Sequence, residues 1–403
     1  MSAVATQAFR KLLDRAEKAW TRDSEARITL PITASSFPAY LDLETLQKKE
    51  EFHSACRGAE RQRAIEVEWD PLAGKEGQIA RLILLDRDKL AAILHATPLW
   101  ESYRAAESAL AGNLNTPSVQ ALLAAWREGK RPRAIGPEQV GDVLDALRVI
   151  SALDQSGGDD IPVRQLSAQL FIDSKRIEKL LPVLDYLTQE DETCTLARQP
   201  EDILASLGLI KFPQPVLMAG RAITHFTNGS TLGIPAPYIG LAPQSLARVE
   251  ASRDARYILT VENYTTFNEI AKGKAGPVEG VVIYTAGMPS PSFLRVYAMA
   301  IDGAIPDVPV YHWGDIDLGG YRIADVLARH AGERGRRLLL WNMNPGNIEG
   351  IPPWAKFSLS DLSWVRTITV KHGWTVELEG VEATRSSYEQ EMLPVRCPSP
   401  PAP

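Results

Sequence analysis

The sequence has few of the features that mark zinc-binding, secreted or membrane proteins. Its 403 residues include three cysteines, Cys56, Cys194 and Cys397, which lie far apart and form no Cys-x-x-Cys pair. That spacing argues against a zinc site and against a disulfide framework. The longest apolar runs, such as Arg81–Asp86, have the length of a strand, and the first residues do not resemble a secretion signal. We therefore expect a cytoplasmic protein without a membrane span.

The chain also lacks the basic excess of a protein that coats DNA. It carries 44 Lys and Arg against 50 Asp and Glu, a formal net charge of −6. Local basic surfaces can coexist with an acidic total, and a site for a hard cation needs carboxylates, so the charge does not exclude a metal-dependent enzyme. The length exceeds that of one compact core and predicts two or three domains.

The N-terminal region, residues 1–138, predicts a mixed α+β arm domain. Residues 8–19 favour a helix, and residues 28–32 a short strand. Residues 64–69 alternate apolar and charged side chains, which is typical of a half-buried strand, and residues 80–85 can pair with them.

Residues 139–210 predict an all-helical, winged-helix-like domain. Two helices separated by Phe171–Ser174 have the spacing of a helix-turn-helix, and Asp173 or Ser174 can cap the second helix. Such a helix would turn basic side chains toward phosphates, although short amphipathic helix pairs are also common structural units. The candidate DNA-binding residues are Arg164, Lys175, Arg176 and Lys179.

The remaining residues, 211–403, predict an α/β domain. Strand-like runs at residues 256–261, 278–284, 308–313 and 337–341 alternate with helical segments. This alternation predicts a parallel sheet flanked by helices, in which ligands gather at the carboxyl ends of the strands.

Three carboxylates follow two of these strands. Glu262 ends the first strand, and Asp315 and Asp317 follow the third, with Gly314 before them and glycines behind. In an extended segment, residues two apart point to the same side, and oxygen ligands suit Mg²⁺ or Mn²⁺. Such a cation can neutralise a phosphoryl group and activate a water. The alternative is that the aspartates only cap the helix that follows.

This order of motifs resembles the Toprim domain of topoisomerases, primases and certain nucleases. A preceding helix-turn-helix is similar to the A subunit of topoisomerase VI. The closer resemblance is to the nuclease subunit of Wadjet/Mks plasmid-defence systems, the JetD or MksG family. The segments that carry it are Leu166-Ser167, Asp173–Lys175, Val261–Phe267, Gly314–Asp317 and Tyr388–Glu391.

The resemblance implies a DNA endonuclease that cuts circular plasmid DNA together with an SMC-like condensin complex. Glu262, Asp315 and Asp317 would be catalytic and would hold Mg²⁺ or Mn²⁺, with Glu391 or Glu389 as a further carboxylate. A single site cuts one strand, so cleavage of both strands predicts a homodimer.

The choice between hydrolysis and a topoisomerase reaction depends on a tyrosine. The topoisomerase relatives attack DNA with a tyrosine of the helix-turn-helix domain, but residues 139–210 contain only Tyr186, in an apolar run typical of a core. We therefore expect hydrolysis by an activated water. Two alternatives stay open: a breaking-and-rejoining enzyme, and a non-catalytic DNA-binding adaptor of an SMC complex.

Overall fold

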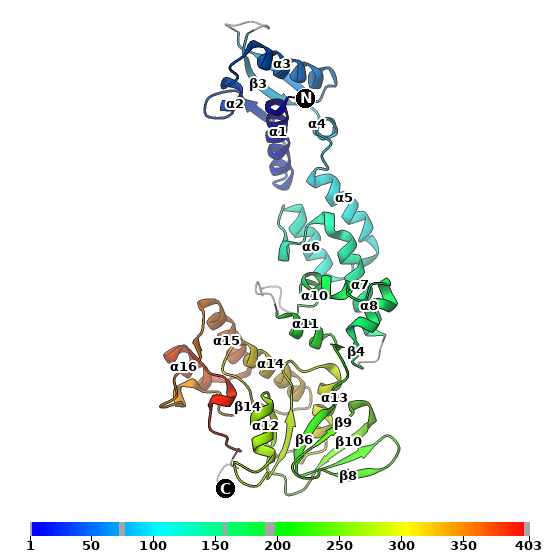
Figure 1. Ribbon diagram of the computed structural model, residues 1–403, viewed down its shortest axis with the longest axis vertical. Coiled ribbons are helices and arrows are strands. Elements are labelled where there is room, and N and C mark those ends of the chain that lie inside the picture. The colour runs from blue at the N-terminus through cyan, green and yellow to red at the C-terminus, as the bar shows by residue number, and fades with distance from the viewer. Residues whose placement is uncertain (1, 72–76, 156–158, 190–197, 399–403) are drawn as a thin grey trace. The chain divides into compact units, whose positions relative to one another are not determined.

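The computed structural model describes residues 2–71, 77–155, 159–189 and 198–398. The chain forms two compact units, which Figure 1 shows as ribbons. Unit 1 comprises residues 1–147 and 182–197, and unit 2 comprises residues 148–181 and 198–403. None of the helices in the described ranges has the length and apolar character needed to span a membrane.

Unit 1 is a mixed α+β unit, as its sequence predicts. Helix α1 begins after Ser2, whose hydroxyl accepts a hydrogen bond from the amide of Ala5, and it turns one apolar face toward a three-stranded antiparallel sheet of order β1-β3-β2. The elements of this unit are α1 (Ala3–Thr21), β1 (Thr29–Pro31), α2 (Pro38–Leu41), α3 (Leu46–Arg61), β2 (Ile65–Trp69), β3 (Ile79–Leu84), α4 (Arg87–Leu94), α5 (Leu99–Ala109), α6 (Pro117–Arg127), the first part of α7 (Val140–Asp154) and most of α10 (Leu181–Leu187).

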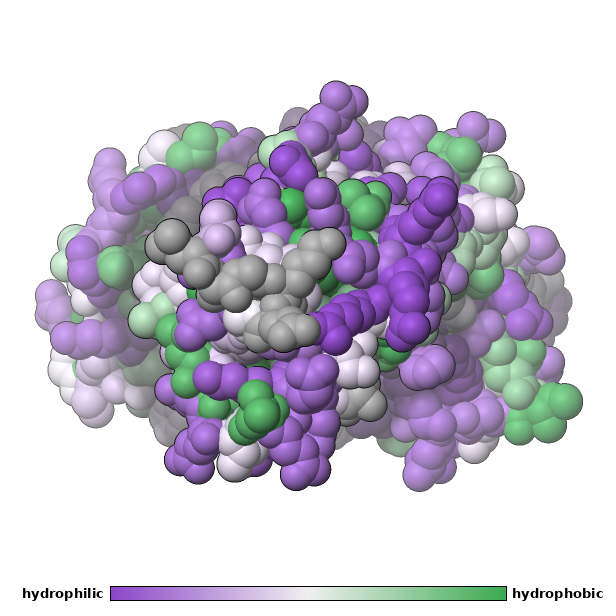
Figure 2. Space-filling view, turned by 90° about the horizontal axis from the view of Figure 1, so that it is seen from above, coloured by the Kyte–Doolittle hydropathy of each residue, from purple (hydrophilic) through white to green (hydrophobic). Residues whose placement is uncertain are grey.

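The surface in Figure 2 is mainly hydrophilic. Hydrophobic side chains stand singly or in small groups on the face shown, and no broad apolar area is visible there. Scattered exposed apolar residues are ordinary for a folded protein.

Unit 2 is built on a six-stranded mixed sheet of order β14-β13-β11-β12-β6-β9. Its elements are β4 (Ile161–Pro162), α8 (Val163–Phe171), α9 (Arg176–Lys179), α11 (Pro200–Ser206), β5 (Leu209–Ile210), β6 (Val216–Gly220), β7 (Ala222–Phe226), β8 (Thr231–Gly233), β9 (Ile239–Leu241), β10 (Leu246–Ala251), β11 (Ile258–Val261), α12 (Tyr264–Ala271), β12 (Val281–Tyr284), α13 (Pro291–Asp302), β13 (Val310–Trp313), α14 (Leu318–Gly332), β14 (Leu338–Leu340), β15 (Ala355–Lys356), α15 (Leu359–His372), α16 (Thr375–Thr384) and β16 (Ser386–Ser387).

The central strands confirm the predicted alternation, and the edges correct it. Strands β14, β13, β11 and β12 run parallel, and every residue of β11 is buried. Strands β6 and β9 are antiparallel to their neighbours, so the sheet is mixed, not purely parallel. A separate antiparallel sheet of order β10-β7-β8 was not predicted, because its strands are short and their apolar pattern is weak.

The segment 139–210 is not all-helical. Strands β4 and β5 pair in parallel through Ile161 with Leu209 and Pro162 with Ile210. Two-residue strands leave no periodic pattern in a sequence, so only the tertiary structure reveals them.

The topology brings one group of strand ends together. From β11 the chain passes through α12 to β12 on one side, and later through α13 to β13 on the other side. The carboxyl ends of β11 and β13 therefore flank a point where the strand order reverses, and such points favour ligand sites in open α/β sheets.

Candidate active site

Glu262, Asp315 and Asp317 lie at this edge of the sheet. Glu262 directly follows β11, and the aspartates follow β13, which pairs with β11 so that Val261 is opposite Trp313. The backbone amide of Asp315 donates a hydrogen bond of 3.1 Å to Oε2 of Glu262. The parallel register thus joins two segments that are 53 residues apart in the chain.

Two glycines make the close approach possible. A Cβ atom on Gly314 would lie 2.6 Å from Oε2 of Glu262 and 2.7 Å from Nε2 of His312. A Cβ atom on Gly320 would lie 2.1 Å from the carbonyl oxygen of Asp315. At Gly320 the close atom is backbone and leaves no room for a Cβ, and at Gly314 a Cβ would displace the side chains of Glu262 and His312.

Asp317 also caps the helix that follows it. Its Oδ1 accepts a hydrogen bond of 2.8 Å from the amide of Gly320, at the N-terminus of α14. The capping role considered as an alternative is therefore present in Asp317. One carboxylate oxygen accepts this bond, so capping accounts for only part of what the side chain can bind.

Glu262 and Asp315 are in an environment that disfavours their negative charge. Burial, followed by the nearby charge of Asp315, raises the pKa of Glu262 to about 8. Burial is also the main cause that raises the pKa of Asp315 to about 7, with Glu389 and Asp317 adding to it. The carboxylates repel one another in a partly desolvated place, and a cation between them would relieve both costs.

The C-terminal segment closes the site through a residue that the sequence did not suggest, Gln390. The backbone N–H of Gln390 donates a hydrogen bond of 2.6 Å to Asp315 Oδ1. Its side-chain oxygen accepts from the backbone N–H of Asn263 at 2.7 Å, and its side-chain nitrogen donates to the carbonyl of Trp313 at 3.0 Å. Gln390 is fully buried. It therefore ties the ends of β11 and β13 to one another.

The two glutamates beside Gln390 have different surroundings. Glu389 interacts directly with Asp315 and raises the pKa of that carboxyl. Glu391 is exposed, and its Oε2 accepts a hydrogen bond of 3.2 Å from the Asn263 side chain. The structure thus places Glu389 against Asp315 and Glu391 against Asn263.

Asp202 and Arg322 are two more charged residues near the carboxylates that sequence reasoning missed. Burial raises the pKa of Asp202, on α11, while Arg322 lowers it and Asp317 raises it. Nη2 of Arg322 is buried and makes no hydrogen bond within the described residues. Neither residue lies in a strand-end motif, so no local pattern identifies them.

His312 is the buried neighbour of the site. Its Nδ1 lies 2.9 Å from Oγ1 of Thr260, and burial lowers its pKa to about 3, so the ring is neutral. Its buried Nε2, which has no hydrogen-bond partner among the described residues, lies close to Gly314.

Of the predicted DNA-binding residues, Arg164 lies on α8, Lys175 directly precedes α9, and Arg176 and Lys179 lie on α9. Arg164 Nε lies 3.9 Å from Glu178, and Lys179 donates to Asp173 at 2.9 Å. The second helix is a single turn that begins after Lys175, so the prediction that Asp173 or Ser174 caps it was wrong. Asp173 instead accepts a hydrogen bond from the amide of Lys175.

Among the described residues, no three His, Cys, Asp or Glu side chains are already arranged to hold a metal ion. The site as described is a set of converging carboxylates from β11, β13, α11 and the C-terminal segment.

Two protein-family models match this chain, one in its N-terminal half and one in its C-terminal half. A family model described as "Wadjet protein JetD, C-terminal" matches residues 230–339, which include Glu262, Asp315 and Asp317. A second model, described as an uncharacterized N-terminal region conserved in bacteria (DUF3322), matches residues 10–189.

A curated relative agrees with these matches. The chain is 26% identical over 195 residues to the Wadjet protein JetD of Bacillus cereus (strain Q1). The match covers 47% of this chain and 47% of the relative, so it spans about half the length of that protein. Together with the family models, it supports a relationship between this chain and the JetD proteins of Wadjet systems.

Proposed function

We propose that this protein is a metal-dependent endonuclease that hydrolyses circular plasmid DNA as a subunit of a Wadjet defence system. The observation that carries the proposal is the convergence of Glu262, Asp315 and Asp317 at the strand ends, where the pKa values of Glu262 and Asp315 are raised. Perturbed carboxylates gathered at such an edge are typical of functional sites.

The residues present fit a hard divalent cation. The donors are carboxylate oxygens, which Mg²⁺ and Mn²⁺ prefer over nitrogen or sulfur. We propose Glu262, Asp315 and Asp317 as the ligands, with Glu389 as the further carboxylate because of its interaction with Asp315. When bound, the cation would supply charge neutralisation on the phosphate and activation of a water.

The chain's own residues would prepare the site for the phosphate. Gln390 fixes Asp315 and the end of β11, so the carboxylates would need little rearrangement on binding. The positive charge of Arg322, whose Nη2 makes no hydrogen bond within the described residues, would offset negative charge from the DNA. His312 is neutral and buried, so it can orient neighbours without adding charge.

Hydrolysis is favoured over a covalent tyrosine intermediate by the surroundings of α8. Where the resemblance to topoisomerase VI would place a tyrosine, the chain has Ser167, Gln169 and Phe171. Ser167 donates to the carbonyl of Asp173 and accepts from the amide of Ile177, so it holds the turn between α8 and α9. A serine with both roles filled is structural. We propose that the product is an unlinked DNA break.

The proposed setting is supported by the similarity to JetD proteins. We propose that the protein acts with the other Wadjet subunits, an SMC-like complex, and that two copies place two sites across the duplex. A sedimentation mass equal to the monomer at micromolar concentration, with and without DNA, would contradict the homodimer.

The test is cleavage of supercoiled plasmid by the purified full chain with Mn²⁺ or Mg²⁺. Glu262→Gln is the test variant, and Glu269→Gln, which removes a surface ion pair with Lys274, is the matched control. We expect nicked or linear plasmid with the native chain and the control, and intact plasmid with Glu262→Gln or a chelator. A covalent protein–DNA adduct abolished by Tyr186→Phe would support the rejoining alternative instead.

If the isolated chain leaves plasmid intact, the assay is repeated with the Wadjet complex. Intact plasmid there too, together with calorimetry that detects no Mn²⁺ binding, would favour the adaptor alternative. Equal cleavage by the native chain and Glu262→Gln would place the chemistry elsewhere.

A further inference from the structure

A cavity of about 510 Å³ lies in unit 2 beside the end of β14. It is lined by Trp341, Asn342, Asn347, Glu377, Leu393 and Arg396, among others, and these six residues define what we call the Asn342 pocket. Its volume is within the range of pockets that hold a small organic group. No part of the carboxylate site lines it.

The Asn342 pocket is nevertheless a neighbour of the carboxylates. Met343, which also lines it, accepts a hydrogen bond from the amide of Gly314 at 3.4 Å through its sulfur. Leu393 follows Gln390 by three residues, a span of about 11 Å at most. The pocket is therefore within reach of the nucleotides next to a phosphate at the carboxylates.

The polar groups of the pocket are in part unused. Asn344 is committed to the fold, because its side chain accepts from the amide of Gly346 and donates to the carbonyl of Val376. No hydrogen bond within the described residues uses the side chains of Asn342, Asn347 or Arg396.

The walls of the pocket supply apolar contacts. The indole of Trp341 donates to the carbonyl of Arg396 at 2.9 Å, which fixes the C-terminal segment as one side of the pocket. Trp341 and the aliphatic side chain of Leu393 are apolar surfaces on this side. The pocket thus combines free side-chain amides, a guanidinium, the carboxyl groups of Glu349 and Glu377, and apolar surface.

We propose that the Asn342 pocket receives an unstacked nucleobase of the DNA strand next to the cleaved phosphate. Side-chain amides match the donor and acceptor edges of bases, apolar and aromatic walls contact their faces, and a guanidinium can meet the adjoining phosphate. The inference rests on the proposed function, because it assumes that DNA lies at the carboxylates.

Unstacking a base costs energy, so the pocket favours DNA in which a base is already free. Base flipping in duplexes costs a few kcal/mol and least where the base is unpaired. The pocket therefore predicts tighter binding to a duplex with a short single-stranded gap than to an intact duplex of equal charge.

The test measures binding of the full chain by fluorescence anisotropy, in a chelator so that no cleavage occurs. The probes are two gapped duplexes that differ only in the gap, which carries thymines in one and abasic sugars in the other. The variant is Asn342→Gly with Asn347→Ala. Glycine suits the backbone at Asn342, where φ is 54°. Asn115→Gly, on an exposed turn of unit 1, is the matched control.

We expect the native chain and the control to bind the thymine gap about five- to tenfold more tightly than the abasic gap. The pocket variant should lose that preference and keep the native affinity for the abasic gap. A native thermal unfolding midpoint in the variant would show that folding is intact.

Other results would overturn the inference. If the variant retains the preference for thymine, the base binds elsewhere and the proposed function is unaffected. If the variant binds both probes normally but no longer assembles with the other Wadjet subunits, the pocket serves a protein partner. Absence of any DNA binding by the native chain, alone and in the complex, would contradict the proposed function and this pocket with it.

Discussion

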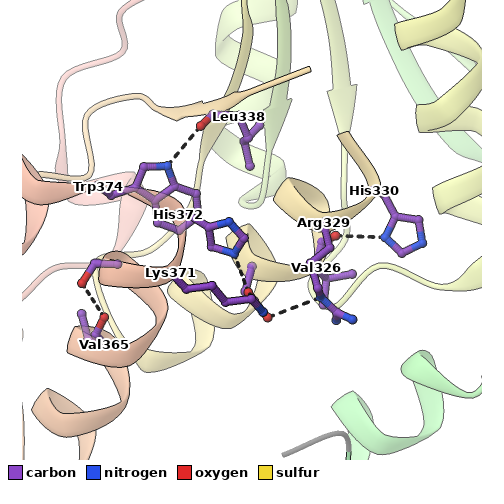
Figure 3. A network of polar contacts seen from close by, with 10 residues as sticks. Val326, Arg329, His330, Leu338, Val365, Lys371, His372 and Trp374 are labelled. Atoms are coloured by element: carbon purple, nitrogen blue, oxygen red, sulfur yellow. Dashed lines mark hydrogen bonds and ion pairs between the residues drawn. The ribbon is translucent and has the colours of Figure 1, made fainter. Parts of the chain in front are cut away.

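Helix α14 carries two aspartates at positions that differ sharply in their surroundings. Asp325, in the middle of the helix, accepts from Lys371 at 2.8 Å and from His372 at 2.6 Å, and Arg329 lies 3.5 Å away. Figure 3 shows these basic side chains, from α14 and from the end of α15, turned toward their common partner, the carboxylate of Asp325. Burial alone would raise the pKa of Asp325, but its hydrogen bonds to His372 and Lys371 outweigh burial and lower it.

The other aspartate, Asp317, begins the same helix and belongs to the carboxylate site. There, Glu262 and Asp315 have other carboxylates as neighbours, and their pKa values rise to about 8 and about 7. An acidic group with its own cations serves the fold. Acidic groups that repel one another favour the binding of a metal cation. This difference between Asp325 and the carboxylate site is the physical basis of the proposed function.

The largest effect should come from Glu262→Gln, which removes a charge without changing shape. We expect cleavage to fall more than about 100-fold, beyond the loss typical of an outer-shell partner. In a chelator the same variant should be more stable than the native chain by about 1–3 kcal/mol at pH 7, because folding of the native chain must keep Glu262 protonated at a pH where the unfolded carboxyl is ionised.

The pH dependence of that gain has a definite sign. The pKa of Glu262 is about 8 in the folded chain and 4.5 as its ordinary value. Stability from the protonated carboxyl is full below 4.5 and is lost as the pH rises through 8. Denaturant unfolding in a chelator should show a growing advantage for Glu262→Gln across this range. A constant difference would contradict the raised pKa.

Gln390→Ala should have the next largest effect. It leaves the carboxylates in place but removes the bridge between the end of β11 and the carbonyl of Trp313. We expect a 10- to 100-fold loss of cleavage and a weaker apparent affinity for Mn²⁺, as for other residues that orient ligands. Gln244→Ala, at an exposed position, is the control. Native Mn²⁺ titration and cleavage in Gln390→Ala would remove Gln390 from the site.

Gly314→Ala tests the carboxylate site through packing, because it adds a Cβ atom without changing any charge. Its Cβ would collide with both Glu262 and His312, at 2.6 and 2.7 Å. We expect a loss of about 1–3 kcal/mol of stability, the range for overpacked positions, together with reduced cleavage. Gly332→Ala is the matched control, because a Cβ there meets nothing within 4 Å. Equal unfolding midpoints for the two variants would mean that the site tolerates a wider spacing.

The sequence indicated the central strands and the three carboxylates because both leave short-range patterns. Residues 256–261 and 308–313 are largely apolar runs with acidic residues shortly after them, and β11 and β13 are where those runs predict them. The mixed character of the sheet was not predictable in this way. Whether β6 joins β12 as an antiparallel neighbour depends on long-range packing, which no local pattern records.

The remaining site residues were missed for a related reason. Gln390 acts through its position 75 residues from Asp315, and a single glutamine carries no motif. Asp202 reaches the site from α11, a helix with an ordinary acidic first turn. Conversely, the basic residues Arg164 and Lys179 formed a suggestive pattern, yet the fold pairs both with acids.

The smallest effect should come from Asp325→Asn, the test of the opposite environment. The folded pKa of Asp325 is lowered, so its contribution to stability is present above 3.8 and is lost as the pH falls through the lowered value. We expect the variant to be about 1 kcal/mol less stable at pH 7, a modest figure because Lys371 is half exposed. The difference should vanish in acid, and cleavage and Mn²⁺ affinity should stay at native values. Asp325→Asn could instead behave like Glu262→Gln, with higher stability and lower cleavage. The surroundings of a carboxylate would then not predict its role in this protein, and the argument for a cation at Glu262 would fail.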